Sequence, residues 1–243
     1  MSLRTKLLDG LLGIAAAVTV TTTIVLGLRL PPTQEQDEYA RLIAVHPAIA
    51  WTAYLAFGVM ALASALWLVP ATRSRMWDRL AASSAEVGVV FTALMLVTGS
   101  IWGRPTWGVW WVWDARLTLS ALMLALLLGY VALRAVSVDT ERRALLSAIA
   151  GLGAVVVIPL NHFAVTWWRT LHQGRSLANV SPGRELDGEY IAVMLVGFVA
   201  MTLTYAWLLL RRYRVEALAE EVDDEGLTTA LEERRREGLE VLT

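Results

Sequence analysis

The tryptophans of this chain are concentrated in one short segment. Five of the eleven lie in the run Trp102-Gly-Arg-Pro-Thr-Trp107-Gly-Val-Trp110-Trp111-Val-Trp113-Asp114-Ala-Arg116. Flat indole rings offer a large apolar area for stacking, which suits a large planar ligand such as a porphyrin or a quinone. We therefore predict a binding platform in this segment, made of Trp102, Trp107, Trp110, Trp111, Trp113 and Asp114.

The spacing of these residues also suggests how the platform is built. Pro105 is suited to the first turn of a helix. In a helix that follows it, Trp107, Trp110, Trp111 and Asp114 would share one face, at positions i, i+3, i+4 and i+7. This pattern predicts an amphipathic helix lying along a membrane surface. A plain belt of interfacial tryptophans is the alternative, because indole favours the headgroup region of any membrane protein.

The chain has only three histidines, His46, His162 and His172. Neutral imidazole is a common axial ligand of haem iron. His46 and His172 lie on either side of the tryptophan segment along the chain, so two imidazoles could clamp one iron from both faces. His162 is open to three interpretations: a third ligand, a polar residue at the membrane surface, or a hydrogen-bonding neighbour of the site. We favour the last, with Trp167 and Trp168 beside it.

Two arginines flank the platform. Arg104 and Arg116 could hold carboxylates such as haem propionates, because the guanidinium group matches a carboxylate with two parallel hydrogen bonds. Pairing of Arg116 with Asp114 is the alternative use of the second arginine.

These residues must be positioned by membrane-spanning helices. Hydrophobic residues make up 56% of the chain, and the mean hydropathy is +0.54. Runs of spanning length occupy residues 11–30, 43–69, 84–102, 117–136, 144–165 and 190–210. We therefore predict an all-α integral membrane protein with six transmembrane helices, in which residues 1–212 form one domain and residues 213–243 a charged helical tail.

The basic residues predict the orientation of these helices. They precede the first run, join the second to the third and the fourth to the fifth, and follow the sixth: Arg4, Lys6, Arg73, Arg75, Arg79, Arg134, Arg142, Arg143, Arg211, Arg212 and Arg214. Lysine and arginine are retained on the cytoplasmic side. Both termini and the tail are therefore expected in the cytoplasm, and the tryptophan segment and all three histidines on the outer face.

Composition excludes several kinds of chemistry. Without cysteine, the chain has no disulfide, thiolate metal site, iron–sulfur cluster or cysteine nucleophile. No phosphate-binding loop of the Gly-x-x-x-x-Gly-Lys type occurs, so any ATP-driven step needs another subunit. The net charge of −1 makes nucleic acid an unexpected partner. We assign no catalytic residue.

Two stretches resemble a known family. Residues 97–118 carry a signature similar to the WWD motif of haem-handling membrane proteins, and Trp167-Trp168-Arg-Thr-Leu-His172-Gln-Gly174 is similar to the outer loop that holds an axial histidine in that family. The chain is identified as a member of the haem exporter protein C (CcmC) family of cytochrome c maturation, a resemblance that covers residues 1–212. Pro47 follows His46 directly where the family pattern has His-x-Pro, and Leu119-Ser120-Ala121 lacks the family's acidic residue.

The resemblance implies a function and partners. It implies that His46 and His172 are the axial ligands of a haem b, which the WWD segment supports from beneath at the periplasmic face of the inner membrane. It further implies that the haem passes to the chaperone CcmE, in a complex with the ABC transporter subunits CcmA and CcmB and the small subunit CcmD. Such a protein presents haem rather than turning over a substrate, although a lyase-like assisting role would also fit.

Two other classes of function compete with this one. A transmembrane b-type cytochrome that exchanges electrons with quinone would also use paired histidines, but it needs haems at two depths. A solute transporter or channel would carry ionisable residues along its spans. None of the predicted spans has a charged residue near its middle, and Glu86 lies near one end of the third.

Overall fold

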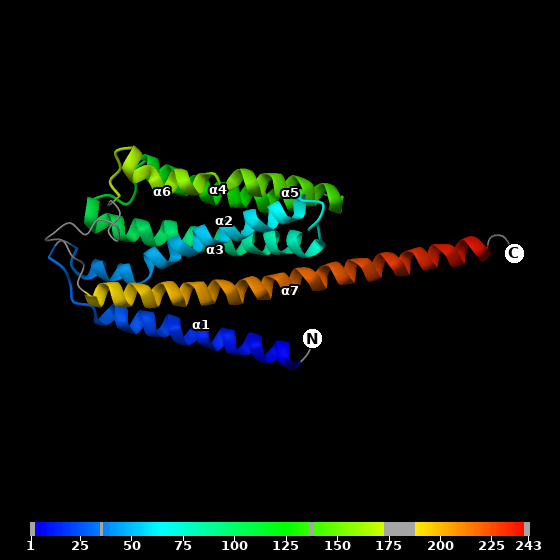
Figure 1. Cartoon of the computed structure of the whole chain (residues 1–243), viewed down its shortest axis with the longest axis horizontal. Helices are drawn as coiled ribbons and strands as arrows, with labels where there is room; N and C mark the ends of the chain where they lie inside the picture. The colour runs from blue at the N-terminus through cyan, green and yellow to red at the C-terminus, as the bar shows by residue number, and fades with distance from the viewer. Residues whose placement is uncertain (1–2, 35, 137–138, 173–187, 241–243) are drawn as a thin grey trace.

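The computed structural model describes residues 3–34, 36–136, 139–172 and 188–240, and these residues are organised as helices (Figure 1). The elements are α1 (Leu3–Arg29), η1 (Glu38–Ala44), α2 (His46–Leu68), α3 (Arg75–Trp107), α4 (Ala115–Val136), α5 (Thr140–Ala154), α6 (Val157–Trp167) and α7 (Gly188–Glu240).

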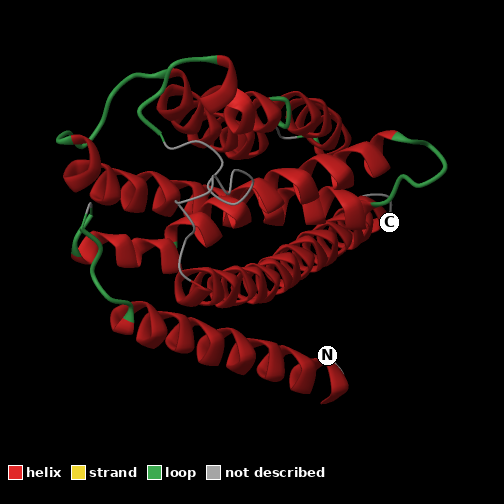
Figure 2. Ribbon diagram, turned by 60° about the vertical axis from the view of Figure 1, so that its left-hand side comes forward, coloured by secondary structure: helices red, strands yellow, loops and turns green. Residues whose placement is uncertain are grey.

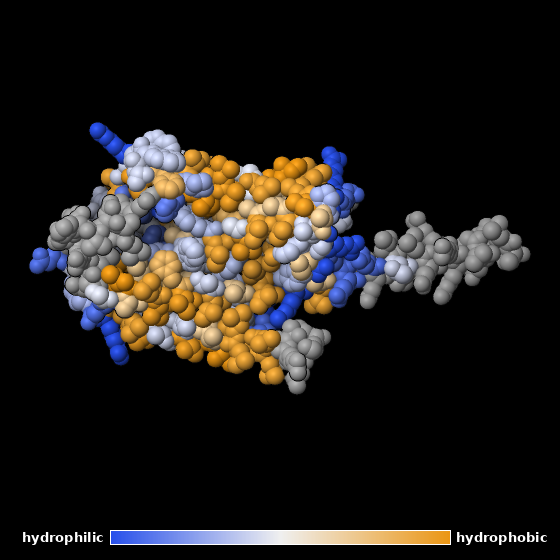
Figure 3. Space-filling view, viewed as in Figure 1, coloured by the Kyte–Doolittle hydropathy of each residue, from blue (hydrophilic) through white to orange (hydrophobic). Residues whose placement is uncertain are grey.

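Six helical segments are long and apolar enough to cross a membrane, which confirms the predicted fold class. They are Lys6–Arg29, Glu38–Leu68, Arg75–Trp107, Ala115–Val136, Thr140–Trp167 and Gly188–Val222. A helix satisfies all its backbone hydrogen bonds internally, which is what a segment in lipid requires. At about 1.5 Å per residue, each segment exceeds the ~30 Å hydrocarbon core. Apolar side chains cover the middle of the bundle, and hydrophilic ones gather at its ends (Figure 3).

Helices α2 and α3 form the centre of the bundle. They pack along each other, with α4, α5 and α6 on one side and α7 on the other, and α1 packs mainly against α7 (Figures 1 and 2). The centre is filled by Phe57, Met60, Met123 and Leu127, whose side chains are fully buried. Six crossings bring the N-terminus and the far end of α7 to the same end of the bundle (Figure 1).

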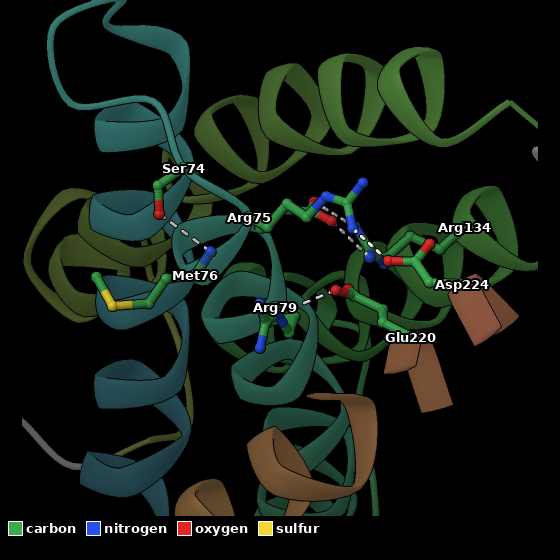
Figure 4. Close-up of polar contacts among 8 residues, drawn as sticks. Ser74, Arg75, Met76, Arg79, Arg134, Glu220 and Asp224 are labelled. Carbon is green, nitrogen blue, oxygen red and sulfur yellow. Dashed lines mark hydrogen bonds and ion pairs between the residues drawn. The ribbon is translucent and has the colours of Figure 1, made fainter. Parts of the chain in front are cut away.

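That end, which we call the arginine-rich end, is held by ion pairs. Asp78 and Arg134 join α3 to α4 through two hydrogen bonds of 2.6 and 3.0 Å, and both side chains are 10% exposed. Helix α7 continues past Arg212 without a break, and its Glu220 lies 3.2 Å from the Arg79 guanidinium of α3 (Figure 4). Beside it, Arg75 pairs with Asp224 at 3.0 Å, next to the Ser74 side chain that caps α3 (Figure 4).

The fifth span is broken, which the apolar pattern did not predict. Helix α5 ends at Ala154 and α6 begins at Val157. Pro159 has no N–H to donate to the carbonyl of Val155, and that carbonyl accepts instead from the N–H of Ile158 at 3.0 Å. The span therefore runs from Thr140 to Trp167, but its hydrogen bonding changes between α5 and α6, just past the middle of the span.

The predicted helix in the tryptophan segment is wrong. The segment does lie between the third and fourth spans, but α3 runs on through Pro105 to Trp107, and residues 108–114 are irregular. Gly108 has a φ of 78°, the left-handed conformation that ends helices, and its N–H closes the last turn on the Arg104 carbonyl at 3.0 Å. Trp107, Trp110, Trp111 and Asp114 therefore do not share a helix face.

Candidate functional site

The opposite end of the bundle, which we call the tryptophan-rich end, contains the predicted site residues. His46 is the first residue of α2, and Pro47 follows in the first turn, where its missing N–H costs no intrahelical bond. The chain just before His46 is tightly enclosed, because a Cβ atom at Gly197 of α7 would overlap the carbonyl oxygen of Ala44. On the other side, a Cβ at Gly27 of α1 would lie 2.9 Å from the Ala44 Cβ. Two glycines thus fix the position from which His46 projects.

One turn of α3 encloses the His46 ring. The ring Nδ1 lies 2.9 Å from the hydroxyl oxygen of Thr98, and the Trp102 indole meets the imidazole edge-on with centroids 5.7 Å apart. Gly99 leaves room for the ring, since a Cβ there would lie 3.0 Å from His46 Cε1. Trp102 is itself fixed by an indole N–H donated to Gln36 at 3.1 Å.

The second histidine lies against the end of α3. His172 is half-buried, and its ring centroid is 6.1 Å from that of Trp107. Trp107 is folded back over Gly103, where a Cβ would lie 2.9 Å from the indole ring. His172 therefore approaches the tryptophan segment at Trp107, one and a half turns along α3 from the Trp102 that contacts His46.

Asp114 connects this histidine to the rest of the site. One carboxylate oxygen accepts from the N–H of Leu117 at 2.8 Å and caps α4, while the other accepts from the N–H of Leu171 at 2.9 Å. The residue before His172 is thus tied to the end of the tryptophan segment. Asp114 therefore positions both the start of α4 and the residue before His172, and its place in the platform stays a prediction.

The two arginines bind backbone carbonyls. Arg104 donates to the Gly108 carbonyl at 2.7 Å, and Arg116 donates to the carbonyls of Asn161 and His162 at 2.9 and 3.4 Å. In the described part of the chain, neither arginine is paired with a carboxylate, so the alternative pairing of Arg116 with Asp114 does not form. Each guanidinium keeps further N–H donors for a ligand.

The tryptophans of the irregular segment differ in exposure. Trp110 is 59% exposed and Trp113 75% exposed. Trp111 meets Trp113 edge-on at 5.5 Å, and its indole N–H is buried without an acceptor among the described residues. Exposed apolar surface of this kind marks an interaction site more often than a folding core.

His162, Trp167 and Trp168 lie along α6 and its end. His162 is exposed, and its ring contacts Phe163 at 5.1 Å and Tyr54 at 6.4 Å between centroids. Phe163 in turn stacks on Trp167 at 5.2 Å, which meets Trp168 edge-on. These three residues form an aromatic strip that leads toward the loop of His172.

A polar network beneath the site was not predicted. Asn161 is 1% exposed and accepts from the Tyr54 hydroxyl at 2.5 Å, while its amide donates to the Arg116 carbonyl at 3.0 Å and to Ser120 at 2.9 Å. This network ties α2, α4 and α6 together under Arg116. A single asparagine within an apolar run was the available signal, because a buried amide needs partners.

The site therefore assembles residues from distant parts of the chain. His46 comes from α2 and His172 from the loop after α6, and both contact tryptophans of the same segment. Two imidazoles suit an iron whose remaining ligands come from a macrocycle, and the neighbouring indoles suit the flat face of that macrocycle.

Comparison with known proteins supports this interpretation. The chain matches the family described as Heme exporter protein C over residues 1–228. The protein of that name from Haemophilus influenzae is 37% identical over 215 residues, which cover 88% of this chain and 86% of the relative. Those from Bradyrhizobium diazoefficiens and Escherichia coli K12 are 36% and 38% identical over 79% and 67% of this chain, and over 72% and 66% of their own lengths. The chain therefore belongs to the Heme exporter protein C (CcmC) family.

Proposed function

We propose that this protein binds haem between His46 and His172 and presents it, for cytochrome c maturation, to the haem chaperone CcmE. Membership of the Heme exporter protein C family gives the chain a part in haem handling. One observation carries the finer proposal: two histidines 126 positions apart in the numbering are each packed against a tryptophan of the same segment, His46 against Trp102 and His172 against Trp107.

The remaining groups of the site fit the rest of a haem b molecule. Its porphyrin is flat and apolar and would lie on the indoles of the WWD segment. Its two propionates would accept from the unused N–H donors of Arg104 and Arg116. The Trp111 indole N–H makes no hydrogen bond to a described residue, so it is a further donor for a carboxylate. His162 would stand beside the haem as a neighbour, with Trp167 and Trp168 closing the edge.

The distribution of charge supports a periplasmic site. Basic residues next to the spans are more numerous at the arginine-rich end, with eleven there and seven at the other end, so by the positive-inside rule the arginine-rich end would face the cytoplasm. The tryptophan-rich end then faces the periplasm, where the exposed Trp110 and Trp113 leave one side of the haem accessible to the chaperone. The chain from residue 213 onward would be a cytoplasmic extension near the ABC transporter subunits CcmA and CcmB, and CcmD would join them within the membrane.

Presentation of haem requires no catalytic turnover by this chain. The site residues act by ligation, stacking and hydrogen bonding, and we assign none of them as a nucleophile or a general base. A transmembrane b-type cytochrome would need two pairs of histidines at two depths, whereas this chain has three histidines, all at the tryptophan-rich end.

Absorption spectroscopy of the purified protein tests the proposal. With haem supplied, the parent should show a Soret band with bis-histidine character in both oxidation states. His46→Ala and His172→Ala should each lose that character, whereas His162→Ala, the matched control, should keep it. Parent-like spectra in both ligand variants would refute the assignment of His46 and His172.

A further inference from the structure

We infer that Thr98 is a positioning residue that holds the proton of the His46 imidazole on Nδ1 and so leaves Nε2 as the atom that binds iron. The inference rests on the proposed function, since it concerns how one of the proposed ligands is prepared. It adds a residue and an atomic role that neither the tryptophan signature nor the identity of the histidine supplies.

The hydrogen bonds around Thr98 assign the proton. The Thr98 hydroxyl oxygen lies 2.7 Å from the carbonyl oxygen of Leu94, one turn back on α3. A carbonyl can only accept, so two oxygens at this distance require the single hydroxyl proton to lie between them. The Thr98 oxygen then has only lone pairs to offer to His46 Nδ1, 2.9 Å away. Nδ1 must therefore be the donor, and in a neutral ring Nε2 is left unprotonated.

The surroundings fix the ring as well as its proton. The Cε1 edge of His46 rests against the bare backbone of Gly99, and Trp102 meets the ring edge-on at 5.7 Å. All three contacts come from about one turn of α3: Thr98 makes the hydrogen bond, Gly99 leaves space for the ring, and Trp102 makes the aromatic contact. Among the described residues, no group hydrogen-bonds to Nε2.

Such an arrangement is what a metal-binding imidazole needs. A ligand histidine usually donates its other N–H to a fixed acceptor, which selects the tautomer and the ring orientation, and loss of that acceptor typically weakens metal binding about 10- to 100-fold. A histidine side chain in water carries its proton mainly on Nε2, the nitrogen that would have to bind iron. Thr98 thus removes a competing form of the ring before haem arrives.

The first test uses the protein without haem. In chains labelled with ring ¹⁵N-histidine and reconstituted in lipid bilayers, solid-state NMR distinguishes protonated from unprotonated ring nitrogens, and His46→Ala identifies the His46 signals among the three histidines. The parent should show His46 protonated on Nδ1. Thr98→Val, which keeps the shape of the side chain and removes the hydroxyl, should shift the proton to Nε2, and Thr98→Ser should restore the parental spectrum.

The second test measures haem binding in the same three proteins. Thr98→Val should bind haem about tenfold more weakly than the parent, and Thr98→Ser should bind like the parent. A parent protonated on Nε2, or a valine variant with the parental tautomer, would overturn the inference even if His46 ligates haem. The opposite result is also possible: the parent carries its proton on Nδ1, but His46→Ala leaves the haem spectrum unchanged. This result would refute His46 as a haem ligand and leave the tautomer assignment intact.

Discussion

The two ends of the bundle use charged residues in different ways. At the arginine-rich end the arginines are paired with carboxylates from neighbouring helices, as in Asp78–Arg134 and Arg79–Glu220. At the tryptophan-rich end Arg104 and Arg116 donate to backbone carbonyls instead. In the first arrangement, each arginine is neutralised by a carboxylate of another helix, and the ion pair holds the two helices together. In the second, no carboxylate among the described residues pairs with either guanidinium, so their positive charge would be available to the anionic ligand of the proposed site.

The buried ion pair should give the largest effect on stability. Asp78→Asn leaves Arg134 buried without its counter-charge, which typically costs about 3–5 kcal/mol. We expect a loss of this size in the free energy of unfolding, measured by denaturation in mixed detergent micelles, with the haem spectrum of the folded fraction unchanged. The matched control is Glu141→Gln, which breaks the exposed pair with Arg73 at 3.2 Å and should cost less than about 1 kcal/mol. Equal losses from the two variants would contradict the structural role of the buried pair.

Gly197 tests how the fold sets the position of His46. In Gly197→Ala the new methyl group meets the carbonyl of Ala44, the last residue of η1 and two residues before the histidine, so η1 and α7 must separate. Overpacking of this kind costs about 1–3 kcal/mol, and we expect weaker haem binding in addition to lower stability. Gly58→Ala places a methyl group where nothing lies within 4 Å, and serves as the control. Unaltered haem titration of Gly197→Ala would show that the position of His46 does not depend on this contact.

Asp114 and Asp139 allow capping to be separated from site formation. Each caps a helix, Asp114 at α4 and Asp139 at α5, where its carboxylate accepts from the N–H of Arg142 at 2.6 Å. Replacement of either by alanine should cost about 1 kcal/mol of stability. Only Asp114→Ala also releases the N–H of Leu171 beside His172, so only this variant should weaken haem binding, as followed by titration of the Soret band. A similar loss of haem binding in Asp139→Ala would assign the effect to stability alone.

The sequence predicted the spans and the end of the bundle at which the candidate site residues gather, but not the contacts that hold their side chains. Apolar length and basic connections are local properties, which is why the six crossings could be read from the chain. The pairing of His46 with Thr98 joins residues 52 positions apart and depends on the rotation of α2 against α3. The irregular course of residues 108–114 was missed because helical spacing outweighed the turn signal of Gly108. A polar residue at position 161 indicates that partners are needed, but the sequence does not show that they are Tyr54 of α2 and Arg116 and Ser120 of α4.

The smallest effect on stability is expected at the most exposed tryptophan of the site. Trp113 is 75% exposed, so Trp113→Ala removes little buried area and should change the free energy of unfolding by less than about 0.5 kcal/mol. If its indole contacts the porphyrin, the same variant should lower haem affinity severalfold in a Soret titration. Val136→Ala is the control, because Val136 is 77% exposed at the other end of α4 and should affect neither quantity. Unchanged haem affinity in Trp113→Ala would restrict the platform to the tryptophans that contact the two histidines, Trp102 and Trp107. A severalfold loss without a loss of stability would instead show that exposed aromatic surface at this end of the bundle serves the ligand and not the fold.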